Sequence, residues 1–262
     1  AETREEAAVL AGDLKNLNES RKEMTAQGVE KAIEQVESTS MMEDTVLVVF
    51  LPECHESLAG IIAGRLRERY HKPSFVLTRG EEGVKGSGRS IESYSMYEKL
   101  CECKEYLTKF GGHPMAAGLS LEEENVETFR RKLNERSGLS QEDLVEKVSI
   151  DVPMPIHYIR KDLVRELSLL EPFGKGNEKP LFAQKNLWIS QLRVFGKNRN
   201  VVKMRLTDEN GYPMDGVYFG DGDAFAEEAR GKQKIAIVYY PDINVYQGRE
   251  SLQVIIRHYQ FD

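Results

Sequence analysis

A single histidine stands among small residues in the stretch FGGHPMAAGLS, residues 110–120. Gly111 and Gly112 precede it, so the backbone there can adopt positive φ values or approach another group closely. Pro114 follows it and favours an extended conformation at His113. A turn histidine that the fold itself satisfies is the plain alternative. The freedom on one side and the restriction on the other favour a His113 side chain that is aimed at a ligand.

A second glycine-rich stretch, GSGRS at residues 86–90, has the composition of a phosphate site. Glycine lets backbone N–H groups approach a phosphate, and arginine supplies a planar fork that matches phosphate oxygens. An exposed hairpin turn with a solvated arginine is the alternative, since short glycine motifs occur often. No G-x-x-x-x-G-K-[ST] string is present, so binding of a nucleoside triphosphate is not implied. The candidate phosphate-binding residues are Gly86, Ser87, Gly88, Arg89 and Ser90.

Two further groups of metal-ligating residue types carry weaker signals. His55 directly precedes a predicted helix, and helix N-termini bind anions readily, but taken alone it is better explained as a structural residue. Cys101-x-Cys103 is compatible with a metal, yet no second Cys/His pair stands nearby. The sequence therefore predicts no metal ligand, and Cys54, Cys101 and Cys103 are expected to be reduced thiols of a cytoplasmic protein.

A basic stretch with interleaved aromatics lies in the C-terminal half, with no acidic residue between Arg193 and Arg205. Lys203 and Arg205 are two residues apart, so they share one face of a strand. Phosphate contacts combined with base stacking on aromatics hold single strands without sequence preference. The alternative is that the aromatics fill a barrel interior. The candidate nucleic-acid-binding residues are Trp188, Arg193, Lys197, Arg199, Lys203 and Arg205, with Phe195 as a second aromatic.

Length, apolar runs and net charge limit the classes of protein in which these motifs can occur. A length of 262 residues favours two domains. No run approaches the ~20 apolar residues of a membrane span, so no membrane partner is expected. The net charge of −7 argues mildly against a simple nucleic-acid binder, but the acidic excess lies in residues 1–170. The chain begins at Ala1, inside a helical pattern, and is expected to be a fragment.

The first part of the chain reads as an α/β domain behind a long helix. Apolar residues recur at helical spacing over residues 1–37. A strand–helix–strand order at 45–51, 58–70 and 74–78 implies a right-handed parallel unit, with Ser57 as the helix cap. The remaining elements are a glycine-rich turn or strand at 85–90, helices at 95–110 and 124–137, and a strand at 116–121.

After Leu139 short strands and frequent turns predict a small antiparallel barrel of the oligonucleotide/oligosaccharide-binding (OB) type. Asp221-Gly222-Asp223 reads as a turn, and residues 171–182 as a rigid loop between domains. The strand candidates are 148–154, 186–195, 200–208, 213–220, 234–240 and 251–259, and the helix is 160–170.

The two glycine motifs are expected to form one anion site although 24 residues separate Arg89 from His113. We expect both motifs in loops that leave the same edge of the sheet, because ligands settle where such loops meet. An arginine fork opposite a histidine donor holds a phosphate from two directions.

Together these strings resemble the C-terminal half of a RecJ-type single-strand-specific exonuclease of the DHH phosphoesterase superfamily. The resemblance covers nearly the entire chain and implies three parts. These are a connector helix (1–40), a DHH-associated (DHHA1) α/β domain with a mixed sheet and flanking helices (41–140), and an OB-like single-strand-binding domain (141–262). It rests on GSGRS (86–90), FGGHPMAAGL (110–119), HESLAGIIAGRLRERY (55–70), EPFGKGNEKPLF (171–182) and LKNLNESRK (14–22).

The resemblance implies the substrate-binding portion of a 5′→3′ single-stranded-DNA exonuclease of DNA repair and recombination. In such enzymes a separate DHH domain holds Mn²⁺ or Mg²⁺, and the DHHA1 domain grips the substrate. Arg89, Ser90 and His113 would then contact the terminal nucleotide and its phosphates, and the barrel would guide the strand. The implied partners are single-stranded DNA and the DHH domain of the same polypeptide, in a monomer.

This sequence departs from the family pattern in two places. Cys54-His55-Glu56-Ser57 stands where the family often has Trp-His-x-Gly, which puts the role of His55 in doubt. There is no Asp-His-His string and no acidic/histidine cluster for two metals, so the chain alone is expected to hold substrate without cutting it. Two alternatives stay open: a stand-alone single-strand-binding module, and a tRNA-related module like that of alanyl-tRNA synthetases.

Overall fold

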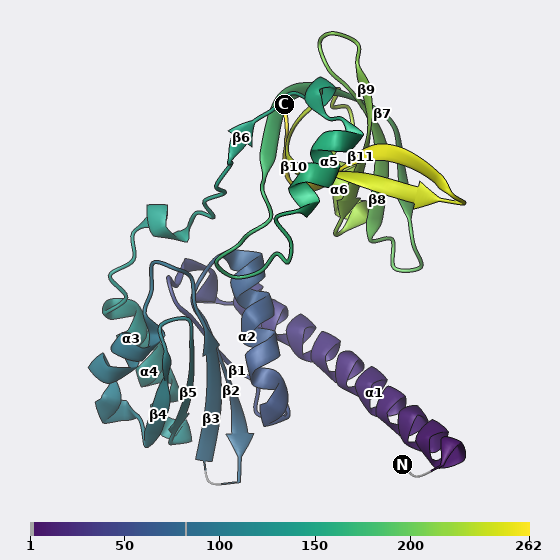
Figure 1. Cartoon of the computed structure of the whole chain (residues 1–262). Helices are drawn as coiled ribbons and strands as arrows, with labels where there is room; N and C mark the ends of the chain where they lie inside the picture. Colours follow the sequence, from purple (N-terminus) through teal and green to yellow (C-terminus); the bar gives the residue numbers. More distant parts are fainter. Residues whose placement is uncertain (1–2, 82) are drawn as a thin grey trace. The chain divides into compact units, whose positions relative to one another are not determined.

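The computed structural model describes residues 3–81 and 83–262, which divide after Lys147 into two compact units, each with its own core (Figure 1). The first unit is an α/β domain with a long N-terminal helix, and the second is a mostly β barrel. The fold class expected from the sequence is therefore confirmed. None of the described helices is long and apolar enough to cross a membrane.

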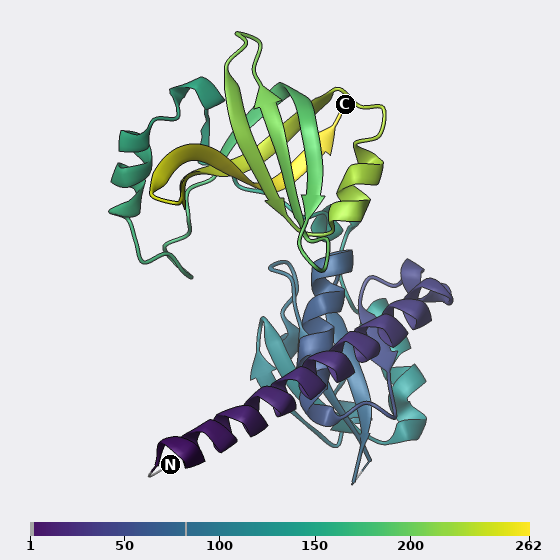
Figure 2. The ribbon, with the colours of Figure 1, turned by 90° about the vertical axis from the view of Figure 1, so that its right-hand side faces the viewer.

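The N-terminal helix α1 (Arg4–Glu37) begins after Thr3, whose side chain accepts a hydrogen bond from the backbone N–H of Glu6. Its buried residues, Gly28, Ala32 and Val36, all lie near its C-terminal end, where it packs against α2 (Glu56–Tyr70). The earlier turns extend beyond the sheet of this unit (Figures 1 and 2). Their exposed apolar residues are Val9, Leu10, Leu14, Leu17 and Met24.

The first unit is built on a five-stranded mixed sheet of order β1-β2-β3-β5-β4. Strand β1 pairs with β2 in parallel through α2, as the strand–helix–strand pattern predicts, and the other pairs are antiparallel. The strands are β1 (Leu47–Phe50), β2 (Ser74–Gly80), β3 (Gly83–Arg89), β4 (Lys109–His113) and β5 (Ala116–Leu121).

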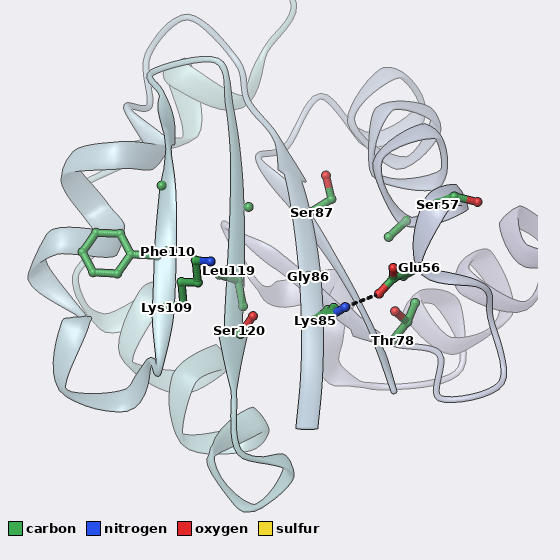
Figure 3. A pocket seen from close by; sticks show the side chains of 13 residues that line it. Glu56, Ser57, Thr78, Lys85, Gly86, Ser87, Lys109, Phe110, Leu119 and Ser120 are labelled. Atoms are coloured by element: carbon green, nitrogen blue, oxygen red, sulfur yellow. Dashed lines mark ion pairs between the residues drawn. The ribbon is translucent and has the colours of Figure 1, made fainter. Parts of the chain in front are cut away.

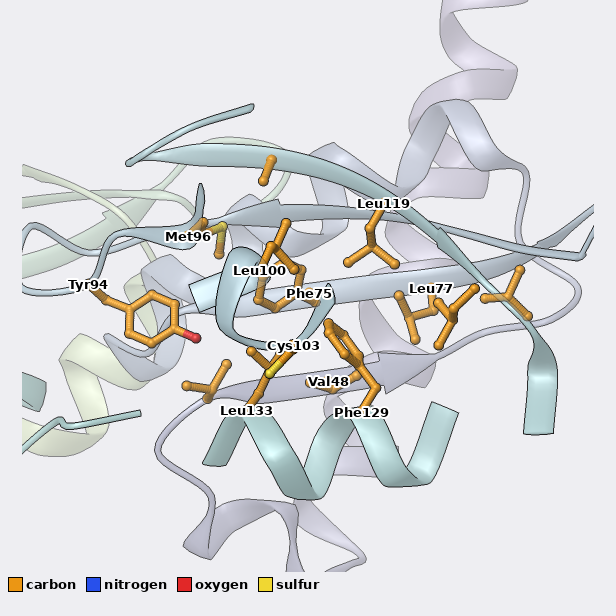
Figure 4. Close-up of a cluster of buried hydrophobic side chains, with 14 of the residues drawn as sticks. Val48, Phe75, Leu77, Tyr94, Met96, Leu100, Cys103, Leu119, Phe129 and Leu133 are labelled. Atoms are coloured by element: carbon orange, nitrogen blue, oxygen red, sulfur yellow. The ribbon is translucent and has the colours of Figure 1, made fainter. Parts of the chain in front are cut away.

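One face of this sheet carries the main apolar core (Figure 4). Phe75 and Leu77 of β2 and Leu119 of β5 pack there against Phe129 and Leu133 of α4 (Val126–Glu135). Helix α3 (Met96–Glu102) adds its buried side chains to the same cluster. The opposite face is apolar only beneath α2 and α1, at β1 and β2. Over β3, β5 and β4 that second face is polar, and we call this region the open face. Helix α2 borders it along β3, and no described helix covers it over β5 and β4.

The predicted helix at 95–110 is wrong in its second half. Helix α3 ends at Glu102, a 3₁₀ turn follows at Lys104–Tyr106, and residues 109–113 form the edge strand β4. Strand β4 pairs with β5 through a two-residue turn at Pro114 and Met115. The sequence does not indicate this strand because two glycines weaken its strand propensity and its partner strand supplies the hydrogen bonds. Both glycine motifs thus lie in strands, and the expectation of two loops at one sheet edge is wrong.

The second unit closes into a barrel because β10 pairs with both β11 and β7. Strand β9 pairs with β11 in parallel and the short β6 pairs with β7 in parallel, whereas the other pairs of this sheet are antiparallel. Inward-facing apolar residues such as Leu187, Met204 and Ile256 fill the interior together with Phe225. The strands are β6 (Val152–Pro153), β7 (Phe182–Phe195), β8 (Val201–Thr207), β9 (Pro213–Phe219), β10 (Lys234–Tyr246) and β11 (Arg249–Phe261).

Three local expectations in and around these elements are wrong. Of the predicted strand 148–154 only β6 forms, two residues long, while α5 (Lys161–Ser168) lies within the predicted helix. Asp221 is the N-cap of a helix, α6 (Gly222–Glu228), and accepts hydrogen bonds from the N–H groups of Asp223 and Ala224. The cap of α2 is His55 rather than Ser57. Asp-Gly-Asp suits a turn and a helix start equally well, because both use a carboxylate that accepts from nearby backbone N–H groups.

Candidate functional site

Arg89 and His113 lie in one row across the open face. Strand register pairs Arg89 with Ala116 of β5, and Ala116 with His113 of β4. Residues that are directly opposite in neighbouring strands project from the same face of a sheet. The structure therefore brings the two predicted phosphate-binding side chains to the same face, with only the small Ala116 between them.

The Arg89 side chain turns along β3 toward Ser87. Its Nη1 donates to Ser87 Oγ at 3.2 Å and to the Gly88 carbonyl at 2.7 Å. Helix α2 passes close to it at Gly60, where an added Cβ would lie 2.8 Å from Nη2 of Arg89. Among the described residues no carboxylate forms an ion pair with this guanidinium. The fork is thus positioned by hydrogen bonds, and no described carboxylate neutralises its charge.

His113 ends β4 and is exposed. Its ring forms no hydrogen bond with any residue that the structure describes. The neighbouring Gly112 has a φ of +152°, and a Cβ there would lie 2.5 Å from the Ala116 carbonyl oxygen, so only glycine fits. Gly112 thus shapes the hairpin that presents His113, which fits the sequence argument that this histidine is held in an imposed geometry.

A cavity of about 520 Å³ lies on the same face, next to the row that holds Arg89 (Figure 3). The start of α2 forms one wall, and β3, β5 and β4 contribute Ser87, Ser120 and Lys109. At its edge Lys85 Nζ lies 2.7 Å from Glu56 Oε2, and this hydrogen bond is the main reason that the pKa of the Glu56 carboxyl is lowered. Polar groups and two lysines thus line a space of ligand size.

Several predicted phosphate-binding residues serve the fold. The Ser90 hydroxyl is buried and donates to the Tyr94 carbonyl at 2.5 Å. Gly86 and Gly88 face the core, so a side chain on either residue would point into it. A Cβ at Gly88 would lie 2.6 Å from Phe75. Packing therefore explains these two glycines without a ligand.

His55 is a structural residue at the start of α2, as the favoured interpretation of the sequence has it. Its Nδ1 accepts a hydrogen bond from the Ser57 backbone N–H at 3.2 Å and lies 2.8 Å from Ser57 Oγ. The imidazole thus caps α2, and it does not line the cavity on the open face.

On the barrel, the basic and aromatic residues at the end of β7 and the start of β8 face outward. Arg193 and Lys203 are directly opposite in register and both are exposed. The Lys203 ammonium lies 5.9 Å from the centroid of the Phe195 ring. These side chains line a groove of about 260 Å³. Phe195 is 45% exposed and Trp188 is 40% exposed, so neither fills the barrel interior.

Two of the predicted arginines are already paired with carboxylates. Arg199 binds Asp223 at 2.6 Å, which lowers the pKa of Asp223, and Arg205 binds Asp215 at 2.5 Å. Lys197 is exposed and takes part in no ion pair within the described part of the chain. Of the predicted barrel cations, Arg193, Lys197 and Lys203 thus have no carboxylate partner among the described residues.

The described residues contain no group of three or more His, Cys, Asp or Glu side chains that could hold a metal ion. A divalent ion therefore has no fitting set of ligands among them.

The structure adds residues that the sequence did not indicate. Gly60 makes room for the Arg89 fork, because a Cβ there would meet its Nη2. Thr78 and Lys109 reach the site because their strands, β2 and β4, are the neighbours of β3 and β5. No local pattern marks these two residues.

Two family models match the chain, one on each unit. The DHHA1 domain model matches residues 43–138, and the RecJ OB domain model matches residues 150–258. Among curated relatives, the single-stranded-DNA-specific exonuclease RecJ of Bacillus subtilis is 34% identical over 96% of this chain, and that of Escherichia coli is 33% identical over 96%. The chain spans 32% and 45% of the length of these two relatives.

Solved structures agree with this result. RecJ from Thermus thermophilus in complex with Mn²⁺ superposes with a TM-score of 0.81, at 25% identity, over 99% of this chain and 37% of that one. The complex with Mg²⁺ gives a TM-score of 0.80. With a DHHA1 domain followed by a RecJ OB domain, the chain belongs to the family of RecJ single-stranded-DNA-specific exonucleases.

Proposed function

We propose that the chain is the substrate-binding portion of a 5′→3′ single-stranded-DNA exonuclease that acts in DNA repair and recombination. In this proposal Arg89, Ser87 and His113 hold a phosphate of the terminal nucleotide, and the barrel holds the strand behind it. The observation that carries the proposal is the single row of Arg89, Ala116 and His113 on the open face.

The chemistry of the row suits a phosphate better than a neutral ligand. The Arg89 fork can donate two parallel hydrogen bonds to phosphate oxygens, and the His113 ring can donate a third from the other side of Ala116. These groups position the phosphate and stabilise its charge, and they do not activate water. We propose that hydrolysis uses Mn²⁺ or Mg²⁺ on a DHH domain outside these 262 residues. The two structures of Thermus thermophilus RecJ, one in complex with Mg²⁺ and one with Mn²⁺, support this.

The direct experiment compares two oligothymidylates that differ only in a 5′-phosphate or a 5′-hydroxyl, by fluorescence anisotropy with the purified chain. The expected result is tighter binding of the 5′-phosphorylated strand, in a monomeric complex, without release of mononucleotides in Mn²⁺. Equal binding of the two strands, or cleavage by the chain alone, would contradict the proposal. Tighter binding of structured RNA than of either strand would favour a tRNA-related module.

A separate prediction concerns the barrel and salt. If Arg193 and Lys203 contact the phosphate backbone, the double variant Arg193→Ala/Lys203→Ala flattens the log–log dependence of the binding constant on salt by about 1.4, since each single-strand contact contributes about 0.7. The measurement is DNA binding over a series of salt concentrations.

Arg205→Ala is the matched control, because its guanidinium already binds Asp215 and has less charge to offer a phosphate. We expect it to change the slope less than either single variant of the pair. A double variant with the wild-type slope would show that the barrel binds DNA elsewhere.

A further inference from the structure

Gly111 and Gly118 form a directly opposed pair in β4 and β5, on the open face. They lie one row from Arg89 and His113 on one side, and one row from Lys109 and Ser120 on the other. Rows of this kind are about 7 Å apart, since successive residues on one strand face are two positions apart. Both glycines are exposed, so the pair is a floor of bare backbone between two polar rows.

The fold does not require glycine at either position. Neither residue has a φ in the left-handed region. A Cβ on Gly111 would meet nothing within 4 Å, and one on Gly118 would meet only the Gly86 carbonyl oxygen, at 3.8 Å. Glycine inside a strand weakens the strand and often marks close approach of a ligand or another backbone. No backbone or side chain of the described residues comes closer than 3.8 Å to either added Cβ. Close approach of a ligand is therefore the remaining reason for glycine at these two positions.

An independent observation points to the same space. Thr78 is completely buried and lines the cavity beside Lys85, yet its Oγ1 has no hydrogen-bond partner among the described residues. Buried hydroxyls are nearly always paired, so an unpaired one that faces a cavity indicates a polar occupant. The Ser87 and Ser120 hydroxyls line the same cavity.

We infer that the Gly111–Gly118 pair is the floor on which the sugar of the terminal nucleotide lies. The inference rests on the proposed function, which places the 5′-phosphate at Arg89 and His113. The sugar then covers the bare backbone, and the next phosphodiester reaches Lys109, which forms no ion pair within the described part of the chain. A side chain on the floor would lift the sugar and pull the phosphate away from the Arg89 fork.

The experiment uses Gly118→Ala and Gly111→Ala in the 262-residue chain, with binding of 5′-phosphorylated oligothymidylate and thermal unfolding as the two readouts. We expect at least about tenfold weaker binding, the size of one lost hydrogen bond to a charged group. The Tm should be unchanged or raised, because alanine has less unfolded-state entropy to lose. Gly12→Ala on exposed α1 is the matched control and should alter no binding constant.

Lys109→Ala supplies a second measurement. This variant should bind the 5′-phosphorylated thymidine dinucleotide more weakly than the wild type does. Its binding of the mononucleotide thymidine 5′-phosphate should be unchanged, since only the dinucleotide has a second phosphate. If both glycine variants bind the 5′-phosphorylated strand like the wild type, the inference that the sugar lies on the Gly111–Gly118 pair is wrong. The proposed function would still hold in that case, provided that the wild type prefers a 5′-phosphate. If the wild type shows no such preference, the proposed function itself is wrong.

Discussion

Replacing Arg89 by lysine weakens binding of 5′-phosphorylated single-stranded DNA by about ten- to a hundredfold, although the positive charge is kept. An ammonium is a point charge and cannot make the planar two-point contact of a guanidinium. A hydrogen bond to a charged group contributes about 1.5–3 kcal/mol, which corresponds to this range. The wild-type fork is also already oriented by Ser87 Oγ and the Gly88 carbonyl, and lysine would not reproduce that geometry.

Anisotropy with 5′-phosphorylated and 5′-hydroxyl strands measures the effect. The variant should lose its preference for the phosphate and bind the hydroxyl strand like the wild type. Arg79→Lys is a matched control, because Arg79 lies on neighbouring β2 and its guanidinium already binds Glu123 at 2.7 Å. Equal losses on both strands would mean that Arg89 contributes only general charge.

His113→Ala tests the other side of the same row. If both side chains hold one phosphate, their effects should be non-additive, so that His113→Ala weakens binding less in the Arg89→Lys background than in the wild type. Strictly additive losses would place them on separate parts of the ligand.

Replacing Gly88 by alanine destabilises the first unit by about 1–3 kcal/mol, the usual effect of adding a methyl group to a packed core. The new Cβ would lie 2.6 Å from Cε1 of Phe75 and 2.7 Å from Sδ of Met96, and both of these side chains are completely buried (Figure 4). Phe75 cannot move without disturbing its contact with Phe129, whose ring centroid lies 5.9 Å from that of Phe75.

Urea unfolding measures this effect as a lower midpoint at an unchanged m-value. At a temperature where the variant remains folded, its preference for a 5′-phosphate should be kept, since Gly88 faces the core and Arg89 the open face. Gly118→Ala makes the matched comparison: the same change on the opposite face should spare stability and weaken binding. If Gly88→Ala has normal stability but no longer prefers a 5′-phosphate, Gly88 is part of the ligand site and not of the core packing.

Local sequence patterns predict much of the secondary structure of both units. The apolar run at 45–51, the amphipathic stretch at 58–70 and the strand at 74–78 predict β1, α2 and β2, because each pattern is complete within its own element. The short strand candidates and frequent turns of the second half likewise predict most of the barrel strands. The residue types of GSGRS and FGGHPMAAGLS are enough to indicate an anion site. Residue type and short-range spacing therefore indicate which elements form and which chemistry is available.

Only the tertiary structure decided which residues share a surface. Strand β4 exists because β5 pairs with it, although Gly111 and Gly112 have little strand propensity. Arg199 and Arg205 are neutralised by Asp223 and Asp215, which lie on other elements. The division of the glycines between core and open face follows from strand register. A shift of one residue would exchange the two faces, and pairing between segments that are distant in sequence sets the register.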